Sequence, residues 1–560
     1  MKPGLALILA LALVTAAVAD EPITVPGRAG QETTAAAAPA TGPLRLADRE
    51  PLEPARVLAP ARIAAADRLA ALARRNAAGN VPTQNGFERA LDAPVRVRLG
   101  AAELQRAAGG RAEFAGGLLA PAPGGDLSFT LAVEVEGADA LRLHLTDVEL
   151  PDGTRLWTYG DGDATGPPLA VEPGGSSELW LPAVTGARAW LELQLPAAAL
   201  ERGEPAAFEL AGVLELFELD AAGRPAALAA APLADESCLL DVSCVTQTAA
   251  IANASRAVGL MMFTSGGDGF VCSGGLLNDV GGTGTPFFLT ANHCLSTQAE
   301  VSTIDITWDY RSQTCNGPVP SRTSLPRSFG GTLVQSNPIA DFTLIRLNSA
   351  PGNRYFLGWT TSDPVGRDLQ RISHPHGGPQ KYSETTVTTP QGTCQEWPVA
   401  SFLYELRKVG GIVGGSSGAP AWYGDDIVVG QLSGHCGEPP LEPCANDDYT
   451  VDGRFRAAYP FIAGALGGDP LAPPAPTDLF AAKVGKRKAV LKWTDQASTE
   501  DRYEILQLAG GDWQLLKQKK RNTTKVKIKH LERLTTYEFG VRACDGSACS
   551  PIESITVTTR

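Results

Sequence analysis

Short runs in which apolar and polar residues alternate make up most of the chain beyond residue 93. Examples are VRVRL, LSFTLAVEV, LRLHLTDVEL and WLELQLP, separated by turn sequences such as PGG and PDG. Alternation places successive side chains on opposite faces of a strand, so these runs predict β-strands with one buried face. Before them, residues 61–77 have helical spacing, with Ile63, Leu69 and Leu72 on one side. The pattern predicts a β-domain preceded by one helix.

The stretch from Cys238 to about Leu466 is dense in glycine and in short β-like runs, and it has no long helical pattern. Many short strands with frequent turns are typical of a pair of β-barrels. The next segment, GGDPLAPPAPTD, is rich in proline, which cannot continue a sheet, so it predicts a linker. Alternating runs then resume and continue almost to the last residue. The chain is therefore predicted to be all-β.

Length and the first residues indicate several exported domains. The 560 residues exceed the roughly 250–300 at which single cores stop growing. Residues 1–19 run from Lys2 through an apolar stretch to the small residues Ala17, Val18 and Ala19, which is typical of a secretory signal peptide. The apolar run is shorter than the ~20 residues of a membrane span. We expect cleavage after Ala19, no membrane span and a secreted, extracellular protein.

The cysteines agree with export. All ten lie between Cys238 and Cys549. In an oxidising compartment an even number predicts disulfides rather than a redox or metal set. The region before Cys238 has none, which indicates that it is not built to persist outside the cell. Cys544 and Cys549 flank the turn DGSA and are expected to cross-link a hairpin.

The segment GIVGGSSGAP, residues 411–420, is a candidate nucleophile loop. A serine hydroxyl needs a histidine base and a carboxylate that holds the imidazole in the right tautomer. His293, one of only six histidines, ends an apolar strand in FFLTANHCL, and Asp341 stands before the apolar run FTLIRL. These residues are the candidate base and carboxylate.

The order histidine, aspartate, serine is the chymotrypsin-like order. It selects Ser417, which precedes glycine and stands three residues before proline in G-x-S-G-x-P, and not Ser416. The backbone N–H groups of Gly415 and Ser417 are then expected to form the oxyanion hole, because glycine leaves the approach to them open.

Residues 233–467 resemble the bacterial lysyl endopeptidases over most of their length. The matching stretches are RAVGL, FFLTANHC, ADFTLIRLN, GSSGAP and VGQLSG. The resemblance implies a serine endopeptidase with a chymotrypsin-like double β-barrel, no cofactor and no metal, made as a precursor with a long propeptide, here residues 20–232. It carries the triad onto His293, Asp341 and Ser417, and a tryptophan that stacks on the catalytic histidine onto Trp397.

The same resemblance implies three disulfides, which pair Cys238 with Cys444, Cys244 with Cys315, and Cys272 with Cys294. Cys394 and Cys436 then remain and are expected to form a fourth bridge, outside the family pattern.

Ser433 departs from the family, which has histidine at this position. In the wider chymotrypsin class a serine here hydrogen-bonds the triad aspartate. The backbone of the following Gly434 and His435 is expected to pair with an extended substrate, so the change need not harm catalysis.

The residue before the cleaved bond, P1, depends on the floor of the substrate pocket. The family's pocket aspartate aligns near Thr450 in CANDDYTVDGRF, and three acids lie close to it: Asp447, Asp448 and Asp452. A shift of one residue decides which of them points inward. If Asp448 or Asp452 does, cleavage after Lys or Arg is expected. Otherwise the pocket is uncharged and lined by Gly411, Val413 and Thr450, and small or apolar residues are expected.

Activation also differs from that of animal digestive relatives, in which an aspartate precedes the nucleophile and captures a new N-terminus. Ser416 stands there instead, so that ion pair is absent. We expect the propeptide to assist folding, cover the cleft and be cut off between about Pro225 and Glu236.

Residues 476–560, after a linker at 468–475, resemble a fibronectin type III module, with Trp493 on an early strand and Tyr537 placed as a tyrosine corner. Residues 473–560 contain 16 Lys and Arg against 10 Asp and Glu, a net +6 in a chain of net −13. Such a basic face could contact an anionic polysaccharide or a cell surface. The alternative is a solvated strand face kept soluble by lysine.

His374 and His376 in SHPHGG could ligate a metal, but no third ligand is recognisable, and a surface loop is expected. We expect a monomer that acts on proteins or peptides and has no specific nucleic-acid partner. The competing function classes are an inactive protease scaffold used for adhesion and an esterase with the same triad.

Overall fold

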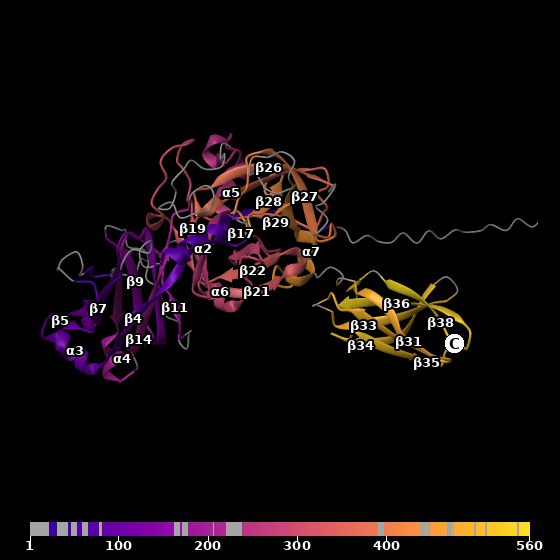
Figure 1. Ribbon diagram of the computed structural model, residues 1–560, viewed down its shortest axis with the longest axis horizontal. Helices are drawn as coiled ribbons and strands as arrows, with labels where there is room; N and C mark the ends of the chain where they lie inside the picture. Colours follow the sequence, from indigo (N-terminus) through magenta and orange to yellow (C-terminus); the bar gives the residue numbers. More distant parts are fainter. Residues whose placement is uncertain are drawn as a thin grey trace, which may run out of the picture.

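The computed structural model describes residues 22–30, 43–45, 53–58, 65–77, 81–161, 169–170, 177–204, 206–219, 238–389, 397–436, 444, 449–467, 473, 475–497, 500–509, 512–545, 548–550 and 552–560. Three domains lie in a row (Figure 1). They are called the N-terminal domain (53–219), the central domain (238–467) and the C-terminal domain (475–560). The expected signal peptide lies outside the described residues.

The N-terminal domain is a sandwich of two sheets. One has the strand order β10-β9-β13-β7-β6-β5, with β3 beside β7, and the other contains β11 and β12 on β8, then β14 and β4. Leu131 and Leu191 from the first sheet pack on Leu143 and Leu210 from the second, as the alternating pattern predicts. Its elements are β3 (Arg56–Leu58), α2 (Ala66–Ala77), β4 (Thr83–Leu99), α3 (Ala101–Ala108), β5 (Ala112–Phe114), β6 (Gly117–Pro121), β7 (Leu127–Val135), β8 (Ala140–Glu149), β9 (Arg155–Gly160), β10 (Leu169–Ala170), β11 (Leu179–Trp180), β12 (Val184–Thr185), β13 (Arg188–Leu195), α4 (Ala197–Glu201) and β14 (Ala206–Leu216).

The central domain consists of two barrels. Strands β25 to β30 of the second barrel form a closed ring, because β29 pairs with both β28 and β30. The first barrel is a half-barrel built from β16 to β22. Its elements are β15 (Leu240–Asp241), α5 (Ala249–Ala257), β16 (Val258–Ser265), β17 (Asp268–Leu277), β18 (Phe287–Ala291), α6 (Gln298–Ser302), β19 (Asp305–Trp308), β20 (Arg327–Phe329), β21 (Gly331–Asn337), η6 (Pro338–Ala340), β22 (Phe342–Leu347), β23 (Tyr355–Phe356), β24 (Gly358–Thr360), β25 (Asp368–Ser373), β26 (Lys381–Thr388), β27 (Phe402–Val409), β28 (Pro420–Tyr423), β29 (Ile427–Cys436), β30 (Tyr449–Arg454) and α7 (Phe455–Ile462).

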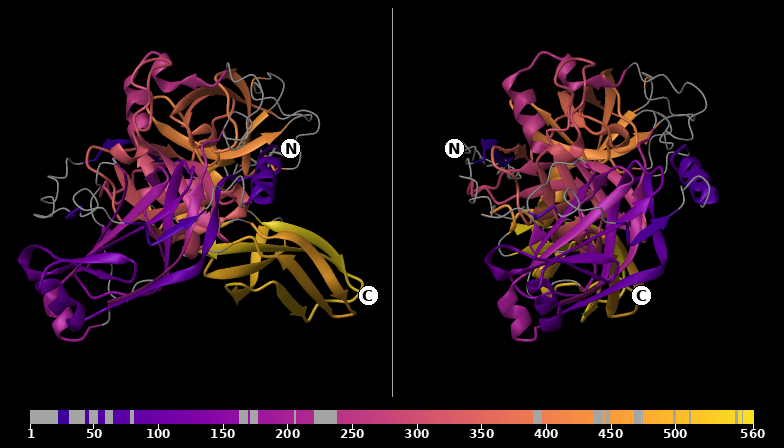
Figure 2. Two further views of the ribbon diagram at one scale, coloured as in Figure 1. Left: turned by 60° about the vertical axis from the view of Figure 1, so that its left-hand side comes forward. Right: turned by 90° about the vertical axis from the view of Figure 1, so that its left-hand side faces the viewer.

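One long strand joins the first two domains into a shared sheet. The start of β4 pairs with β17, with Thr83 opposite Val271 and Phe87 opposite Asp268, while the rest of β4 stays in the N-terminal sandwich. Figure 2 shows the N-terminal strands running up to the central domain. Arg142 of β8 reinforces the junction, since its buried guanidinium donates to the Thr303 carbonyl at 2.8 Å.

The C-terminal domain is a sandwich with β31, β32 and β35 in one sheet and β34, β33, β36 and β38 in the other. Trp493 lies in its core beside Tyr503, and the Tyr537 hydroxyl accepts the Glu532 N–H at 2.8 Å, which is the tyrosine corner. The expected all-β class, with two barrels followed by a fibronectin-type sandwich, is confirmed. Its strands are β31 (Thr477–Val484), β32 (Lys488–Thr494), β33 (Arg502–Ala509), β34 (Asp512–Lys520), β35 (Lys525–Lys529), β36 (Thr536–Asp545), β37 (Ala548–Cys549) and β38 (Glu553–Thr558).

Among the described residues, no helix has the length and apolar character needed to cross a bilayer.

Candidate active site

His293 and Asp341 lie at neighbouring strand ends of the first barrel. β18 pairs antiparallel with β22, with Ala291 opposite Phe342, so the residues just beyond these two positions meet. The Asp341 carboxylate accepts the His293 backbone N–H at 2.8 Å and lies 2.7 Å from Nδ1 of the ring. A carboxylate at Nδ1 fixes the proton there and leaves Nε2 as the basic nitrogen.

Asp341 is held in an uncommon backbone conformation. It follows η6, has a φ of 46°, and lies after a turn in which the Asn337 side chain accepts the Ile339 N–H. Gln431, fully buried on β29, donates from Nε2 to the carbonyls of Ala340 and Asp341 at 2.8 and 3.2 Å. Two hydrogen bonds from the second barrel therefore hold the loop that carries Asp341.

The two serines of the glycine-rich loop face different surroundings. Ser416 is fully buried and its Oγ lies 3.1 Å from Oγ of Ser373 in the second barrel. The Ser417 carbonyl accepts the Ser273 N–H at 2.8 Å. A Cβ added at Gly418 would lie 2.8 Å from the nitrogen of Ala291, two residues before His293. The backbone at Ser417 and Gly418 therefore packs against the first barrel, whereas the Ser416 side chain faces the second barrel.

A hydrogen bond to His376 fixes the orientation of the Gly414–Gly415 peptide before Ser417. The Gly414 carbonyl accepts the His376 N–H at 2.7 Å. Because the C=O and N–H of one trans peptide point in opposite directions, the Gly415 N–H points away from His376. In the described part of the chain, no backbone carbonyl accepts the N–H of Gly415 or Ser417. Both donors are thus available to a bound oxyanion.

Glycine is required at position 415. Its φ is +89°, and an added Cβ would lie 2.7 Å from the His376 nitrogen and 2.8 Å from the His374 carbonyl oxygen. Any other side chain would be strained in this conformation and would push apart the contacts that orient the loop.

Trp397 lies beside Gly434, and among the described residues neither Ser433 nor Trp397 makes the contact expected of it. The Ser433 Oγ is buried without a hydrogen-bond partner among the described residues, so the expected bond to Asp341 is not formed, because the Asp341 oxygens face His293. Trp397 packs on Phe402 with ring centroids 6.0 Å apart, and its ring lies 3.6 Å from the Cβ position of Gly434. The described residues give Trp397 no ring contact with His293.

Asp452 is an internal ion-pair partner and not a free pocket acid. Its carboxylate accepts from Arg371 Nη2 at 2.5 Å, and the same nitrogen lies 3.2 Å from Glu405. All three side chains are buried. Burial raises the pKa of Asp452 well above its usual range, and the nearby Glu405 raises it further against the opposing effect of Arg371. A substrate cation would therefore have to displace Arg371.

The remaining pocket residues carry no charge where they are described. Thr450, near which the family's pocket aspartate is expected to align, is buried and pairs with His435 across β29 and β30. Burial, followed by the charge of Arg371, lowers the pKa of His435 to about 4, although its ring also hydrogen-bonds the Ile412 backbone. His435 is thus neutral beside the nucleophile loop. Asp447 and Asp448 lie outside the described residues.

Four of the expected disulfides are formed among the described residues, three in the central domain and one in the C-terminal domain. The structure joins Cys238 to Cys444, Cys244 to Cys315, Cys272 to Cys294 and Cys544 to Cys549. The bridge at Cys294 fixes the residue next to His293 to β17. Cys436 is also disulfide-bonded, and its expected partner Cys394 lies outside the described residues.

His374 is not on a surface loop, contrary to expectation. It is fully buried with Nδ1 2.8 Å from the Gly378 carbonyl, and burial lowers its pKa to about 4. It was misassigned because proline and glycine in SHPHGG indicate a turn but not its depth. The His376 N–H is what orients the Gly414 peptide.

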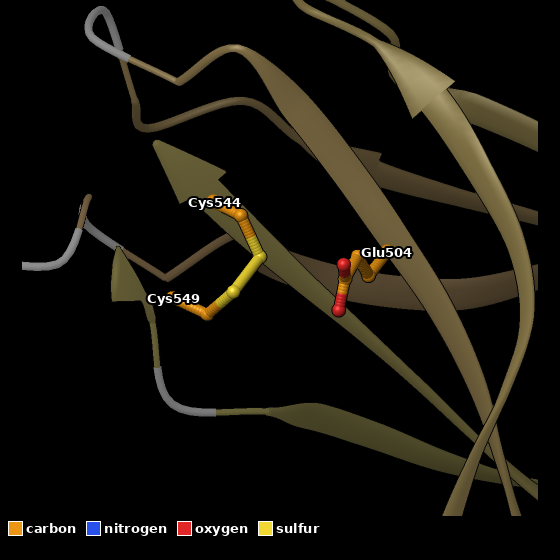
Figure 3. A group of neighbouring side chains, drawn as sticks. All are labelled: Glu504, Cys544 and Cys549. Atoms are coloured by element: carbon orange, nitrogen blue, oxygen red, sulfur yellow. A yellow bond between two sulfur atoms is a disulfide. The ribbon is translucent and has the colours of Figure 1, made fainter. Parts of the chain in front are cut away.

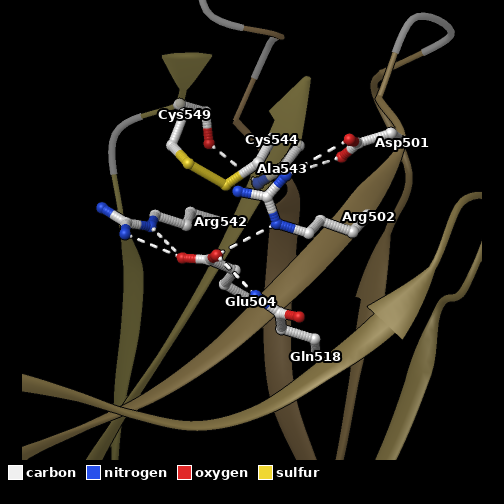
Figure 4. The surroundings of a disulfide bond; sticks show 9 residues. Asp501, Arg502, Glu504, Gln518, Arg542, Ala543, Cys544 and Cys549 are labelled. Carbon is white, nitrogen blue, oxygen red and sulfur yellow. Dashed lines mark hydrogen bonds and ion pairs between the residues drawn. A yellow bond between two sulfur atoms is a disulfide. The ribbon is translucent and has the colours of Figure 1, made fainter. Parts of the chain in front are cut away.

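One group in the C-terminal domain has the spacing of metal ligands: Glu504, Cys544 and Cys549 (Figure 3). The two sulfurs form a disulfide, and Glu504 accepts from Arg502, Arg542 and Gln518 (Figure 4). Neither the thiolates nor a spare carboxylate needed for a metal are present, so the group is structural.

Sequence reasoning missed two residues that support the site. Ser273 supports the nucleophile loop, with its N–H on the Ser417 carbonyl and its Oγ on the Gly415 carbonyl at 2.9 Å. Gln431 holds the Asp341 loop. The signal for Gln431 was a single amide in the apolar run IVVGQL, where a buried polar side chain has to find partners.

Part of the chain is similar in sequence to known proteins. Residues 234–450 match the family described as lysyl endopeptidase, C-terminal domain. The lysyl endopeptidase of Pseudomonas aeruginosa is 29% identical over 351 residues, which are 58% of this chain and 71% of that protein. Secreted RxLR effector protein 73 of Plasmopara viticola is 24% identical over 233 residues, 39% of this chain and 54% of its own length.

Among solved structures, the protease Anisep from Arthrobacter nicotinovorans is 18% identical, with a TM-score of 0.28, and the match covers 36% of this chain and 94% of that one. FN3tt is 18% identical, with a TM-score of 0.15, over 16% of this chain and 94% of its own. From the sequence similarities to the family and to the Pseudomonas enzyme, we conclude that the chain is a lysyl endopeptidase-like serine endopeptidase.

Proposed function

We propose that the protein is a secreted endopeptidase that hydrolyses peptide bonds with Ser417 as nucleophile, His293 as general base and Asp341 as the carboxylate that orients it. The observation that carries the proposal is the two-point contact of Asp341 with His293, with Ser417 on the loop packed against the same strand end. The four disulfides whose two cysteines both lie among the described residues are typical of proteins outside the cytosol, which supports secretion.

In this mechanism His293 Nε2 takes the proton of the Ser417 hydroxyl as Oγ attacks the substrate carbonyl. The Gly415 and Ser417 N–H groups stabilise the oxyanion that forms. His293 then returns the proton to the leaving amine, and water repeats the sequence on the acyl-enzyme. A peptide and an ester share these steps, so the triad alone does not separate a peptidase from an esterase.

Two matched variants test the assignment. Ser417→Ala should abolish peptide hydrolysis and labelling by a fluorophosphonate probe, while Ser416→Ala should keep most of both, because its hydroxyl faces Ser373. Circular dichroism should show both variants folded. Labelled Ser417→Ala, or a folded Ser416→Ala without activity, would refute the assignment. A folded wild type that never labels would support the inactive scaffold.

We propose cleavage after small or apolar residues in place of the family's lysine. The occupied carboxylate of Asp452, the uncharged Thr450 and the neutral His435 support this, because a buried cation without a carboxylate partner is costly. A peptide library read by mass spectrometry should show little Lys or Arg at P1. A strong preference for Lys or Arg would contradict it, and Asp448→Asn would then show whether Asp448 supplies the charge.

We also propose that the N-terminal domain is a propeptide that covers the primed side of the cleft. Addition of β4 to β17 occupies an edge on which a substrate strand could pair. Thr83 lies against the oxyanion loop, since a Cβ on Gly414 would meet its Oγ1 at 2.2 Å. The expected cut between Pro225 and Glu236 lies outside the described residues.

For the C-terminal domain we propose contact with an anionic polymer. Lys488 faces Lys529 and Lys492 faces Lys525 across β32 and β35, and these four exposed lysines have no ion-pair partner among the described residues. Like charges directly opposite each other destabilise a sheet. Binding to an anionic polymer explains these opposed lysines better than solubility alone does.

A further inference from the structure

The residues that begin the described chain, 22–30, do not pack on the N-terminal domain. They cross the central domain as two short strands, β1 (Thr24–Val25) and β2 (Arg28–Ala29). β1 pairs antiparallel with β24, with Val25 opposite Trp359, and β2 pairs with β23, with Arg28 opposite Phe356. This segment is called the strap.

Hydrogen bonds hold the strap along its whole length. Thr361 exchanges two bonds with Ile23, one from Thr361 N to the Ile23 carbonyl and one from Ile23 N to Oγ1, both 2.9 Å. Asn278 Nδ2 donates to the Pro26 carbonyl at 2.9 Å, and the Gly30 N–H donates to the Arg354 carbonyl at 2.8 Å. All of these partners belong to the central domain.

The fit is close enough to specify the strap's sequence. Val25 is 6% exposed and belongs to the core that also contains Trp359 and Val428. A Cβ added at Gly27 would lie 2.6 Å from Asp426 Oδ2 and 2.7 Å from the Tyr355 hydroxyl. Gly358 is equally confined, since its Cβ would meet the Val25 carbonyl oxygen at 2.5 Å.

Beneath the strap the Tyr355 hydroxyl donates to Asp426, which also accepts the Gly27 N–H. β24 in turn pairs parallel with β29, the strand that carries Gln431. The strap therefore continues the sheet that supports the Asp341 loop, and its groove is a ready-made site for an extended peptide.

We propose that the strap is a structural part of the protease and not of the propeptide, and that the groove between β23, β24 and Asp426 retains it as a non-covalent peptide after the N-terminal domain has been removed. This inference rests on the proposed division into propeptide and protease. The mature enzyme would then contain two chains, a short peptide that includes residues 22–30 and the chain that carries Ser417.

The test uses the full chain with Ser417→Ala, into which a recognition sequence for a site-specific protease is inserted between residues 31 and 42. After cleavage and gel filtration in native buffer, mass spectrometry should find one strap peptide per remaining chain. With Val25→Asp, which buries a charge, less than a tenth should remain. The matched control Ala29→Asp changes an exposed position on β2 and should retain the peptide.

A strap peptide that separates from the otherwise unchanged chain would overturn the proposal, as would equal retention in the two aspartate variants. If Val25→Asp fails to fold, Gly27→Leu tests the same groove through the clash with Asp426. Because Ser417→Ala is inactive by design, these outcomes do not depend on catalysis. Fluorophosphonate labelling of the wild type tests the proposed function separately.

Discussion

The buried cluster of Arg371, Asp452 and Glu405 gives the sharpest test of how the second barrel is held together. The perturbation is Arg371→Met, which keeps much of the side-chain volume and removes the cation that, among the described residues, pairs with both carboxyl groups. The raised pKa of Asp452 means that, below this raised value, Asp452 holds a proton and Arg371 faces one carboxylate. Without Arg371 that carboxylate must take up a proton as well.

The free energy of unfolding that Arg371→Met is expected to remove depends on the pH. Protonating a carboxyl group of ordinary pKa near 4.3 costs about 1.36 kcal/mol for each pH unit above it, so about 1 kcal/mol at pH 5, 3–4 at pH 7 and 5 at pH 8. The value at pH 7 agrees with the roughly 3–5 kcal/mol measured when one partner of a buried pair is removed. For a domain of this size, 3–4 kcal/mol lowers the melting temperature by on the order of 10 °C.

The pH dependence of the wild type's stability should also show that folding raises the pKa of Asp452. Between the unfolded value of 3.8 and the raised folded value, the native state binds a proton that the unfolded state has released. This contribution to stability is fully present below pH 3.8 and is lost as the pH rises toward the folded pKa. Asp452→Asn imitates the protonated acid, so it should change the stability by about 1 kcal/mol or less and flatten this part of the pH profile.

Calorimetry of the full chain at pH 5, 7 and 8 measures these effects, with Ser417→Ala in every variant so that autolysis does not distort the scans. The measured quantity is the unfolding transition of the central domain. This transition is identified as the one that is lost when the disulfides are reduced. An Arg371→Met penalty that is the same at pH 5 and pH 8 would refute the titration argument. A penalty below about 1 kcal/mol at pH 8 would show that the three groups are not a coupled buried cluster.

Two further changes probe the oxyanion hole and the C-terminal surface. Gly415→Ala should lower kcat by about 10²–10³-fold, with a smaller effect on KM. The added Cβ collides with the His376 nitrogen and turns the N–H of residue 415 away. Activity within threefold of the wild type in a steady-state assay would contradict this. The double variant Lys488→Glu, Lys525→Glu should elute from a heparin column at clearly lower salt, since each replacement reverses a charge in a cross-strand pair. Unchanged elution would favour the solvated-face alternative. As a control, kcat on a short peptide should be unaffected.

The sequence predicted those parts of the fold that local chemistry determines. Alternation identified the strands around Leu131 and Leu191, but both faces of β7 and β13 are largely buried, where the pattern predicts only one buried face. The tyrosine corner at Tyr537 was recognisable because it needs one residue at a fixed offset. The disulfide partners of Cys238 and Cys272 came from the family resemblance, since sequence alone leaves the pairing of ten cysteines open.

The errors concern contacts between segments that are distant in the chain. Nothing near Asp452 in the sequence shows that Arg371 lies opposite it, because that meeting depends on the closure of the second barrel. Ser433 was expected to bond Asp341, but the carboxylate is already turned toward two donors of His293. The strap lies within the expected propeptide by its position in the chain, and nothing in the local sequence indicates that its partner strands lie more than 300 residues later.

The proposed catalytic residues and the proposed pocket are held by different contacts in the two barrels. The Asp341 loop is held at the junction, where Gln431 donates to the Ala340 carbonyl and a Cβ on Gly453 would meet the Ala340 oxygen at 1.9 Å. Pocket chemistry is fixed inside the second barrel, where Arg371 uses the acid of β30 as an internal counter-ion. Among the described residues the side chains of Gln431 and Asp452 share no hydrogen bond, so we expect a substitution at Asp452 to leave the Asp341 loop in place.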